Sequence, residues 1–75
     1  MELDKFILDF ANQFDETDIS EIQAETHFHD LEEWSSVIGM CVMAMAKTEY
    51  GKTITGTEIK NCVTVEDLFN LIASK

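Results

Sequence analysis

The feature that most constrains this chain is an uncharged run of ten residues, 37–46, which directly follows two adjacent serines. A helix over this run would carry apolar side chains on every face, and such a helix is either buried or offers one face to a partner. A chain of 75 residues cannot bury one helix on all sides, because a domain of this size buries only about 60% of its unfolded surface. Part of this helix should therefore stay exposed, as binding surfaces do.

Residues at both ends of the run bound this helix. It should begin at Ser35 or Ser36, because a serine hydroxyl readily accepts a hydrogen bond from a free N–H group at a helix N-terminus. It should end at Gly51, because glycine suits the left-handed conformation that terminates helices. Cys41 lies inside the run and should be a buried free thiol, since two cysteines do not make a disulfide scaffold.

The rest of the chain predicts three further helices and one long loop. Apolar residues at helical spacing predict an amphipathic helix over residues 2–14, and residues 57–61 suit one short helical turn. The last helix should begin after Thr64, with Asp67 three residues later in a capping-box arrangement. Residues 15–34 are polar and acidic and should form a long loop with room for one short turn. Scattered apolar residues should anchor this loop to the core: Ile19, Ile22, Phe28, Leu31 and Trp34.

No segment alternates with period two for long enough to form a strand, and no linker divides the chain. The sequence therefore predicts a single domain over residues 1–75 with an all-α fold. We expect a small four-helix bundle with three long helices, one short helix and a long first loop.

The chain is strongly acidic, and its negative charge is concentrated in the first half. Fifteen acids face five lysines, and residues 1–35 hold eleven of these acids and one lysine, which gives that segment a net charge of −10. Such a surface repels phosphate backbones, so we expect no nucleic-acid binding. It would attract a partner with a basic patch and speed encounter with it, or it serves only to keep a small protein soluble.

Residues 37–46 are too few to span a bilayer, so we expect no membrane span. The first ten residues carry acids where a secretory signal peptide needs basic residues. The expected environment is therefore the reducing cytoplasm.

Two groups of residues suggest chemistry but are incomplete. His27, His29 and Asp30, with Glu25 nearby, are possible metal ligands, yet a second ligand pair at a diagnostic spacing is missing, so we expect no metal site. The serines, histidines and acids could also be written as a hydrolase triad. A G-x-S-x-G elbow is missing, however, and so small a bundle has little room for a substrate pocket and an oxyanion hole. We therefore expect a protein that is not an enzyme.

The segment SSVIGMCVMAMAKTEYG, residues 35–51, and the segment TVEDLFNLI near the C-terminus together resemble the acyl and peptidyl carrier proteins. Members of that family are small acidic four-helix bundles with a long first loop. Their signature is an Asp-Ser-Leu triplet at the start of the second helix, and its serine carries phosphopantetheine, which a dedicated transferase attaches from coenzyme A. By this resemblance Ser36 matches the modified serine and Val37 the leucine, whereas Ser35 replaces the aspartate.

An alternative alignment, counted from the loop, would place Ser35 on the modified position. We prefer Ser36, because helix geometry determines its distance to Tyr50 and Gly51, whereas loops tolerate insertions.

The resemblance implies an acyl carrier protein that tethers acyl intermediates as thioesters on its phosphopantetheine arm. It implies a monomer whose partners are a phosphopantetheinyl transferase and the acyl-transferring and chain-extending enzymes of fatty acid, polyketide or a related biosynthesis. Because Ser35 replaces the aspartate, an unmodified carrier-like acidic domain that acts as a protein-interaction module stays open as the alternative. The expected docking surface combines acidic and apolar residues: Glu32, Glu33, Trp34, Val37, Met40 and Cys41.

Overall fold

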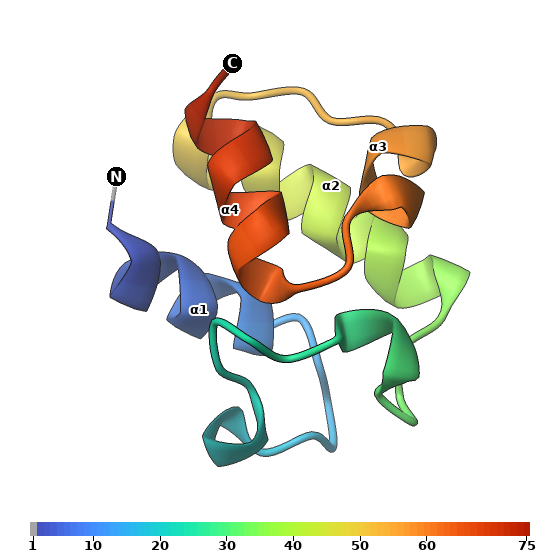
Figure 1. The fold of residues 1–75 in the computed structure, drawn as a ribbon. Helices are drawn as coiled ribbons and strands as arrows, with labels where there is room; N and C mark the ends of the chain where they lie inside the picture. Colours follow the sequence, from blue (N-terminus) through green and yellow to red (C-terminus); the bar gives the residue numbers. More distant parts are fainter. Residues whose placement is uncertain (1) are drawn as a thin grey trace.

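The computed structural model describes residues 2–75, which form four α-helices and two single-turn 3₁₀ helices (Figure 1). The predicted all-α bundle is confirmed, with three longer helices and one short helix. Between the described residues no strand forms, and one isolated bridge joins His27 to Thr64. The helices are α1 (Leu3–Ala11), α2 (Ser36–Tyr50), α3 (Gly56–Asn61) and α4 (Val65–Ala73), and the 3₁₀ helices η1 (Ile19–Glu21) and η2 (Phe28–Asp30) lie between α1 and α2.

One hydrophobic core joins all four helices and the first loop. Helix α1 packs against α2 and α4, and α3 packs against the first half of α2 (Figure 1). Burial of such large apolar side chains supplies the main driving force for folding. The largest fully buried side chains are Phe6, Phe10, Phe28, Val42, Val65, Leu68 and Ile72.

Helix α1 is shorter than the predicted helix over residues 2–14, because it begins at Leu3 and ends at Ala11. The N–H groups of Gln13 and Phe14 bond the carbonyls three residues earlier, at 3.1 and 3.0 Å, so the chain tightens into a turn. Phe14 still reaches the core and is only 7% exposed. The turn after α1 therefore brings Phe14 to the core as a longer helix would, which is why its spacing predicted a helix to residue 14.

Both predicted ends of α2 are confirmed. Ser35 is the N-cap residue, and its hydroxyl oxygen accepts a hydrogen bond from the N–H of Ile38 at 3.3 Å. Gly51 has φ +66°, and its N–H donates to the carbonyl of Lys47 at 3.0 Å, while the N–H of Lys52 donates to that of Ala46 at 3.2 Å. The bond from Gly51 to Lys47, made by a residue in the left-handed conformation, is that of an αL C-cap.

The first loop contains two 3₁₀ turns where one was expected, and one of its predicted anchors is wrong. Ile22 and Phe28 are buried, but Ile19 lies in η1 and is 45% exposed. The loop also holds the start of α4, because the carbonyls of Thr26 and Ala24 accept hydrogen bonds from the first N–H groups of that helix at 3.1 and 3.0 Å. The start of α4 therefore has loop partners in addition to its own cap.

The predicted capping box of α4 is confirmed. The N–H of Asp67 donates to the hydroxyl of Thr64 at 3.0 Å, and the N–H of Thr64 donates to the carboxylate of Asp67 at 3.1 Å. A second box of the same kind starts α3, between Thr55 and Glu58. Each box satisfies two N–H groups that a helix start leaves free.

The left-handed residue at the end of α2 gives a direct test of this fold. Gly51→Ala should lower the free energy of unfolding by about 1–2 kcal/mol, because a side chain is strained in that conformation. Gly56→Ala is the matched control, since Gly56 has no positive φ and a Cβ there would meet no atom within 4 Å. Urea unfolding of both variants measures the difference. An equal effect of the two substitutions would contradict the assigned end of α2.

Candidate functional site

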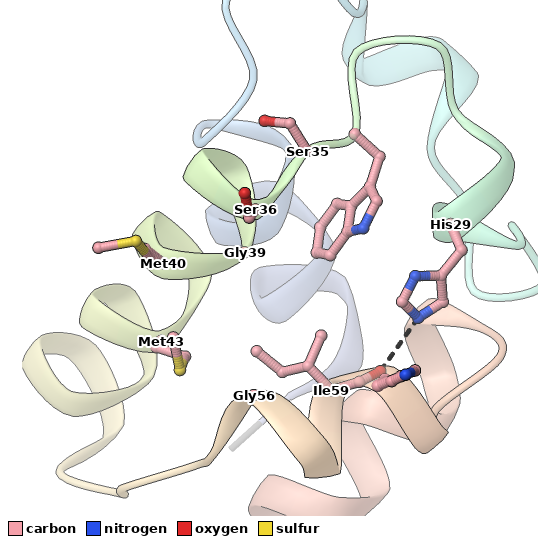
Figure 2. A pocket seen from close by; sticks show the side chains of 10 residues that line it. His29, Ser35, Ser36, Gly39, Met40, Met43, Gly56 and Ile59 are labelled. Carbon is pink, nitrogen blue, oxygen red and sulfur yellow. Dashed lines mark hydrogen bonds between the residues drawn. The ribbon is translucent and has the colours of Figure 1, made fainter.

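The two serines lie at the exposed start of α2 (Figure 2). Ser35 uses its hydroxyl oxygen as the helix cap, whereas Ser36 is the first residue of the helix itself. Both side chains are exposed. The hydroxyl of Ser36 is therefore open to a reagent or an enzyme, and its neighbour secures the helix end beneath it.

A groove of about 380 Å³ begins at these serines and runs between α2 and α3. Its surface is mainly apolar, and the α2 side follows one helix face from Ser36 through Gly39 to Met43, at spacings of three and four residues. The opposite side belongs to α3, through Gly56, Ile59 and Lys60 (Figure 2). An exposed hydroxyl thus stands at the mouth of an open apolar groove.

His29 closes one end of the groove by joining the first loop to α3. Its Nε2 atom lies 3.1 Å from the carbonyl oxygen of Ile59, and because a carbonyl only accepts, the imidazole donates this bond (Figure 2). The imidazole also packs against two aromatic rings, with centroid distances of 4.3 Å to Phe28 and 5.3 Å to Trp34. The position of α3 beside α2 therefore depends partly on this loop residue.

Trp34 connects the groove to the core. Its ring stacks on Phe10 of α1 with a centroid distance of 6.4 Å, and it makes an edge contact with Phe28 with a centroid distance of 4.8 Å. The same side chain also lines the groove. The side chain is half-buried. Trp34 therefore acts as a wall of the groove, and its expected part in partner docking stays a prediction.

Helix α2 has an exposed outer face, a face that lines the groove and a face that lies in the core. The prediction that part of this helix stays exposed is therefore confirmed. Its outer face leaves Val37 66% and Met40 64% exposed. Its groove face includes Gly39 and Met43, and its remaining face lies in the core. The core-facing set is Ile38, Val42, Met45 and Ala46.

The expected full burial of Cys41 is wrong, because this free thiol is only half-buried. It lies on α2 in a shallow hollow shared with Asp9, Asn12 and Gln13, near the end of α1. Cys62 is the buried free cysteine, and burial raises the pKa of its thiol.

Glu33 has a structural role that sequence analysis missed. Its carboxylate accepts bonds from the N–H groups of Asp15, Glu16 and Thr17 at 2.6, 3.0 and 2.8 Å, and from the Thr17 hydroxyl at 2.8 Å. Desolvation would raise the pKa of Glu33, but the bonds from Thr17 and the three backbone groups outweigh it and lower the pKa. The adjacent Glu32 is exposed, and docking by either acid stays a prediction.

The candidate metal ligands are not brought together. His27 Nδ1 lies 3.9 Å from the exposed carboxylate of Asp30, whereas His29 is turned to α3. Over residues 2–75 no three histidine, cysteine, aspartate or glutamate side chains are arranged to hold a metal ion. Within the same residues no helix combines the length and the apolar character that crossing a membrane requires.

A scan against family models, a search of curated proteins and a search of solved structures each found no match to this chain. The interpretation of the site therefore depends on its own geometry and on the residues at the start of α2.

The carboxylate of Glu33 predicts a pH-dependent stability. A lowered pKa in the folded state means that ionised Glu33 stabilises the fold fully above its unfolded value of about 4.5, and that this contribution disappears as the pH falls through the folded value. Glu33→Gln should therefore be less stable than the parent protein at neutral pH, and the difference should shrink below pH 4.5.

Glu32→Gln is the control for this experiment, because it removes the same charge from an exposed neighbour. Thermal unfolding of the three proteins between neutral and acidic pH measures the effect. A loss of stability equal in both variants, or independent of pH, would show that the hydrogen bonds to Glu33 do not matter.

Proposed function

We propose that this chain is an acyl carrier protein, with phosphopantetheine attached to Ser36 and acyl groups carried on the arm as thioesters. The observation that carries the proposal is the exposed hydroxyl of Ser36 on the first residue of α2, at the mouth of an apolar groove. The sequence of α2 and α4 supports it through its resemblance to the carrier family.

The start of α2 fits a phosphate-linked group. Free N–H groups and the aligned peptide dipoles make a helix N-terminus electropositive, which stabilises an anion bound there. Ser36 is the first residue of this helix, so a phosphodiester on its oxygen would lie at that end. No acid lies in the first turn of the helix to repel it.

The replacement of the family's aspartate by Ser35 preserves a physical role. Serine and aspartate are N-cap residues of similar strength, and the hydroxyl of Ser35 accepts the bond from Ile38 that holds the first turn. What the replacement removes is a negative charge next to the attachment site. A transferase that recognises this chain must therefore find its contacts elsewhere.

The attachment step balances with coenzyme A as the donor. The oxygen of Ser36 forms a bond to the phosphorus that bears pantetheine, the pyrophosphate bond breaks, and the adenosine bisphosphate moiety leaves. A base on the transferase takes the hydroxyl proton. The attached arm then supplies a terminal thiol that forms thioesters, whereas the residues of this chain bind and orient the arm.

The groove suits the shielding of a tethered acyl group from water, and the charge distribution suits the attraction of partner enzymes. Met43 offers an adaptable apolar contact to a tethered group, and Ile59 adds apolar surface opposite it, which reduces the exposure of that group to water. Partner enzymes with basic surfaces would be attracted by residues 1–35, whose net charge is −10, and would meet exposed Val37 and Met40 beside Ser36. Presentation on a tether gives the acyl group a high effective concentration at these enzymes.

The modification can be tested by intact mass spectrometry after incubation with coenzyme A and a broad-specificity phosphopantetheinyl transferase. The parent protein should gain the mass of one phosphopantetheine, and Ser36→Ala should gain none. Ser35→Asn is the matched variant, because asparagine retains the N-cap acceptor but has no hydroxyl to modify. It should be modified like the parent protein.

Two other outcomes of the mass measurement would lead to different conclusions. A gain that persists in Ser36→Ala and disappears in Ser35→Asn would place the arm on Ser35. A protein that gains no mass with any transferase would contradict the carrier proposal. It would support the alternative, in which the chain is an unmodified acidic interaction module.

A further inference from the structure

The hydroxyl of Ser35 has a proton that the cap of α2 does not use. A serine hydroxyl offers one donor and two acceptor lone pairs. As the N-cap residue, Ser35 accepts one bond on its oxygen, from the N–H of Ile38 at 3.3 Å. Within the described part of the chain this hydroxyl makes no other hydrogen bond, and the side chain is exposed. The proton is therefore available to water or to a ligand beside the cap.

Ser36 places its own hydroxyl next to this donor. The two serines are neighbours in the chain, both are exposed, and both line the mouth of the same groove (Figure 2). Any group attached to the oxygen of Ser36 therefore begins beside the hydroxyl of Ser35.

A phosphate on Ser36 would have no lysine near it on its own helix. The only lysine of α2 is Lys47, in the last turn, and two acids, Glu32 and Glu33, precede the serines in the sequence. The helix N-terminus offers a partial positive charge, whose effect is confined to the first turn. An additional neutral donor at this position should therefore contribute measurably to holding the anion.

We infer that Ser35 is a positioning residue for the arm: its hydroxyl donates a hydrogen bond to the phosphodiester on Ser36 while its oxygen keeps α2 capped. The inference rests on the proposed function, which supplies the phosphodiester. The bond forms to the product of the attachment step. It therefore concerns how the arm is held at the start of α2, and attachment itself does not require it.

The chemistry of residue 35 determines the sign of the effect. A hydroxyl donates to a phosphate oxygen, and hydrogen bonds to an ionised acceptor are stronger than neutral ones. Aspartate caps a helix as well as serine does, but it only accepts, and its charge would repel the phosphate. Glycine is nearly as good a cap and offers neither a donor nor a charge, whereas threonine keeps the hydroxyl. These three substitutions at Ser35 therefore separate the donor from the cap.

The first test needs no transferase. Phosphoserine introduced at position 36 is the probe, and ³¹P NMR over a pH titration measures its second phosphate pKa, which is ordinarily about 6. A donated bond stabilises the dianion, so Ser35→Gly should raise this pKa by about 0.5. Ser35→Asp should raise it further, because the added like charge disfavours the dianion. Ser35→Thr should leave it at the value of the parent protein.

Other charged groups near the serines do not affect this comparison. His29 and Lys60 line the same groove, and Glu32 and Glu33 lie just before the serines. All four are the same in every variant, so differences in the phosphate pKa report on residue 35. An equal pKa in the parent protein and in Ser35→Gly would overturn the inference.

The second test compares the unmodified and the phosphopantetheine-bearing form of each variant by urea unfolding. Within one variant the cap is the same in both forms, so the change in the unfolding midpoint reports on the arm. Attachment should raise the midpoint most in the parent protein and in Ser35→Thr, less in Ser35→Gly and least in Ser35→Asp.

An equal change of the midpoint in all four proteins would overturn the inference and leave the carrier function standing. Failure of the transferase to modify any of them would instead contradict the carrier function. The titration of phosphoserine would then still decide whether Ser35 donates to a phosphate on residue 36.

Discussion

The location of the candidate site depends on the packing of one indole ring. Trp34 precedes the N-cap of α2 and stacks on Phe10 of α1, while Phe28 of the first loop makes an edge contact with it. Aromatic pairs of this geometry add specific attraction to the burial of their area. Because Ser35 and Ser36 directly follow Trp34 in the sequence, the packing of the indole ring also positions their backbone. The position of Ser36, the attachment point in the proposed carrier, thus depends on the contacts of Trp34 with the core.

Local signals were sufficient to predict α2. Its cap at Ser35 and its end at Gly51 are short-range events between residues a few positions apart, so the sequence alone shows them. The same is true of the box between Thr64 and Asp67. The apolar residues on every face of α2 also predicted an exposed surface correctly, because the argument needs only the length of the chain.

Features that depend on distant partners were missed. Periodicity could not show that α1 ends at Ala11, since Phe14 reaches the core from a turn as well as from a helix. Nor could the sequence show that Cys41 is only half-buried within its apolar run, or that Ile19 is exposed in a turn with no buried residue. The bond from His29 to Ile59 spans 30 residues, so the groove that it helps to close has no local signature.

The hydrogen bonds of Glu33 have a consequence for the variability of this protein. They join residue 33 to residues 15–17, and so the base of the first loop is closed by the chain itself. The tip of that loop, at Ser20, is exposed and lies within the turn η1. Lengthening a loop adds only a slowly growing entropy cost, so extra residues at Ser20 would leave α2 where it is. That tip is the natural place to attach a tag or a label, or for evolution to elaborate the chain.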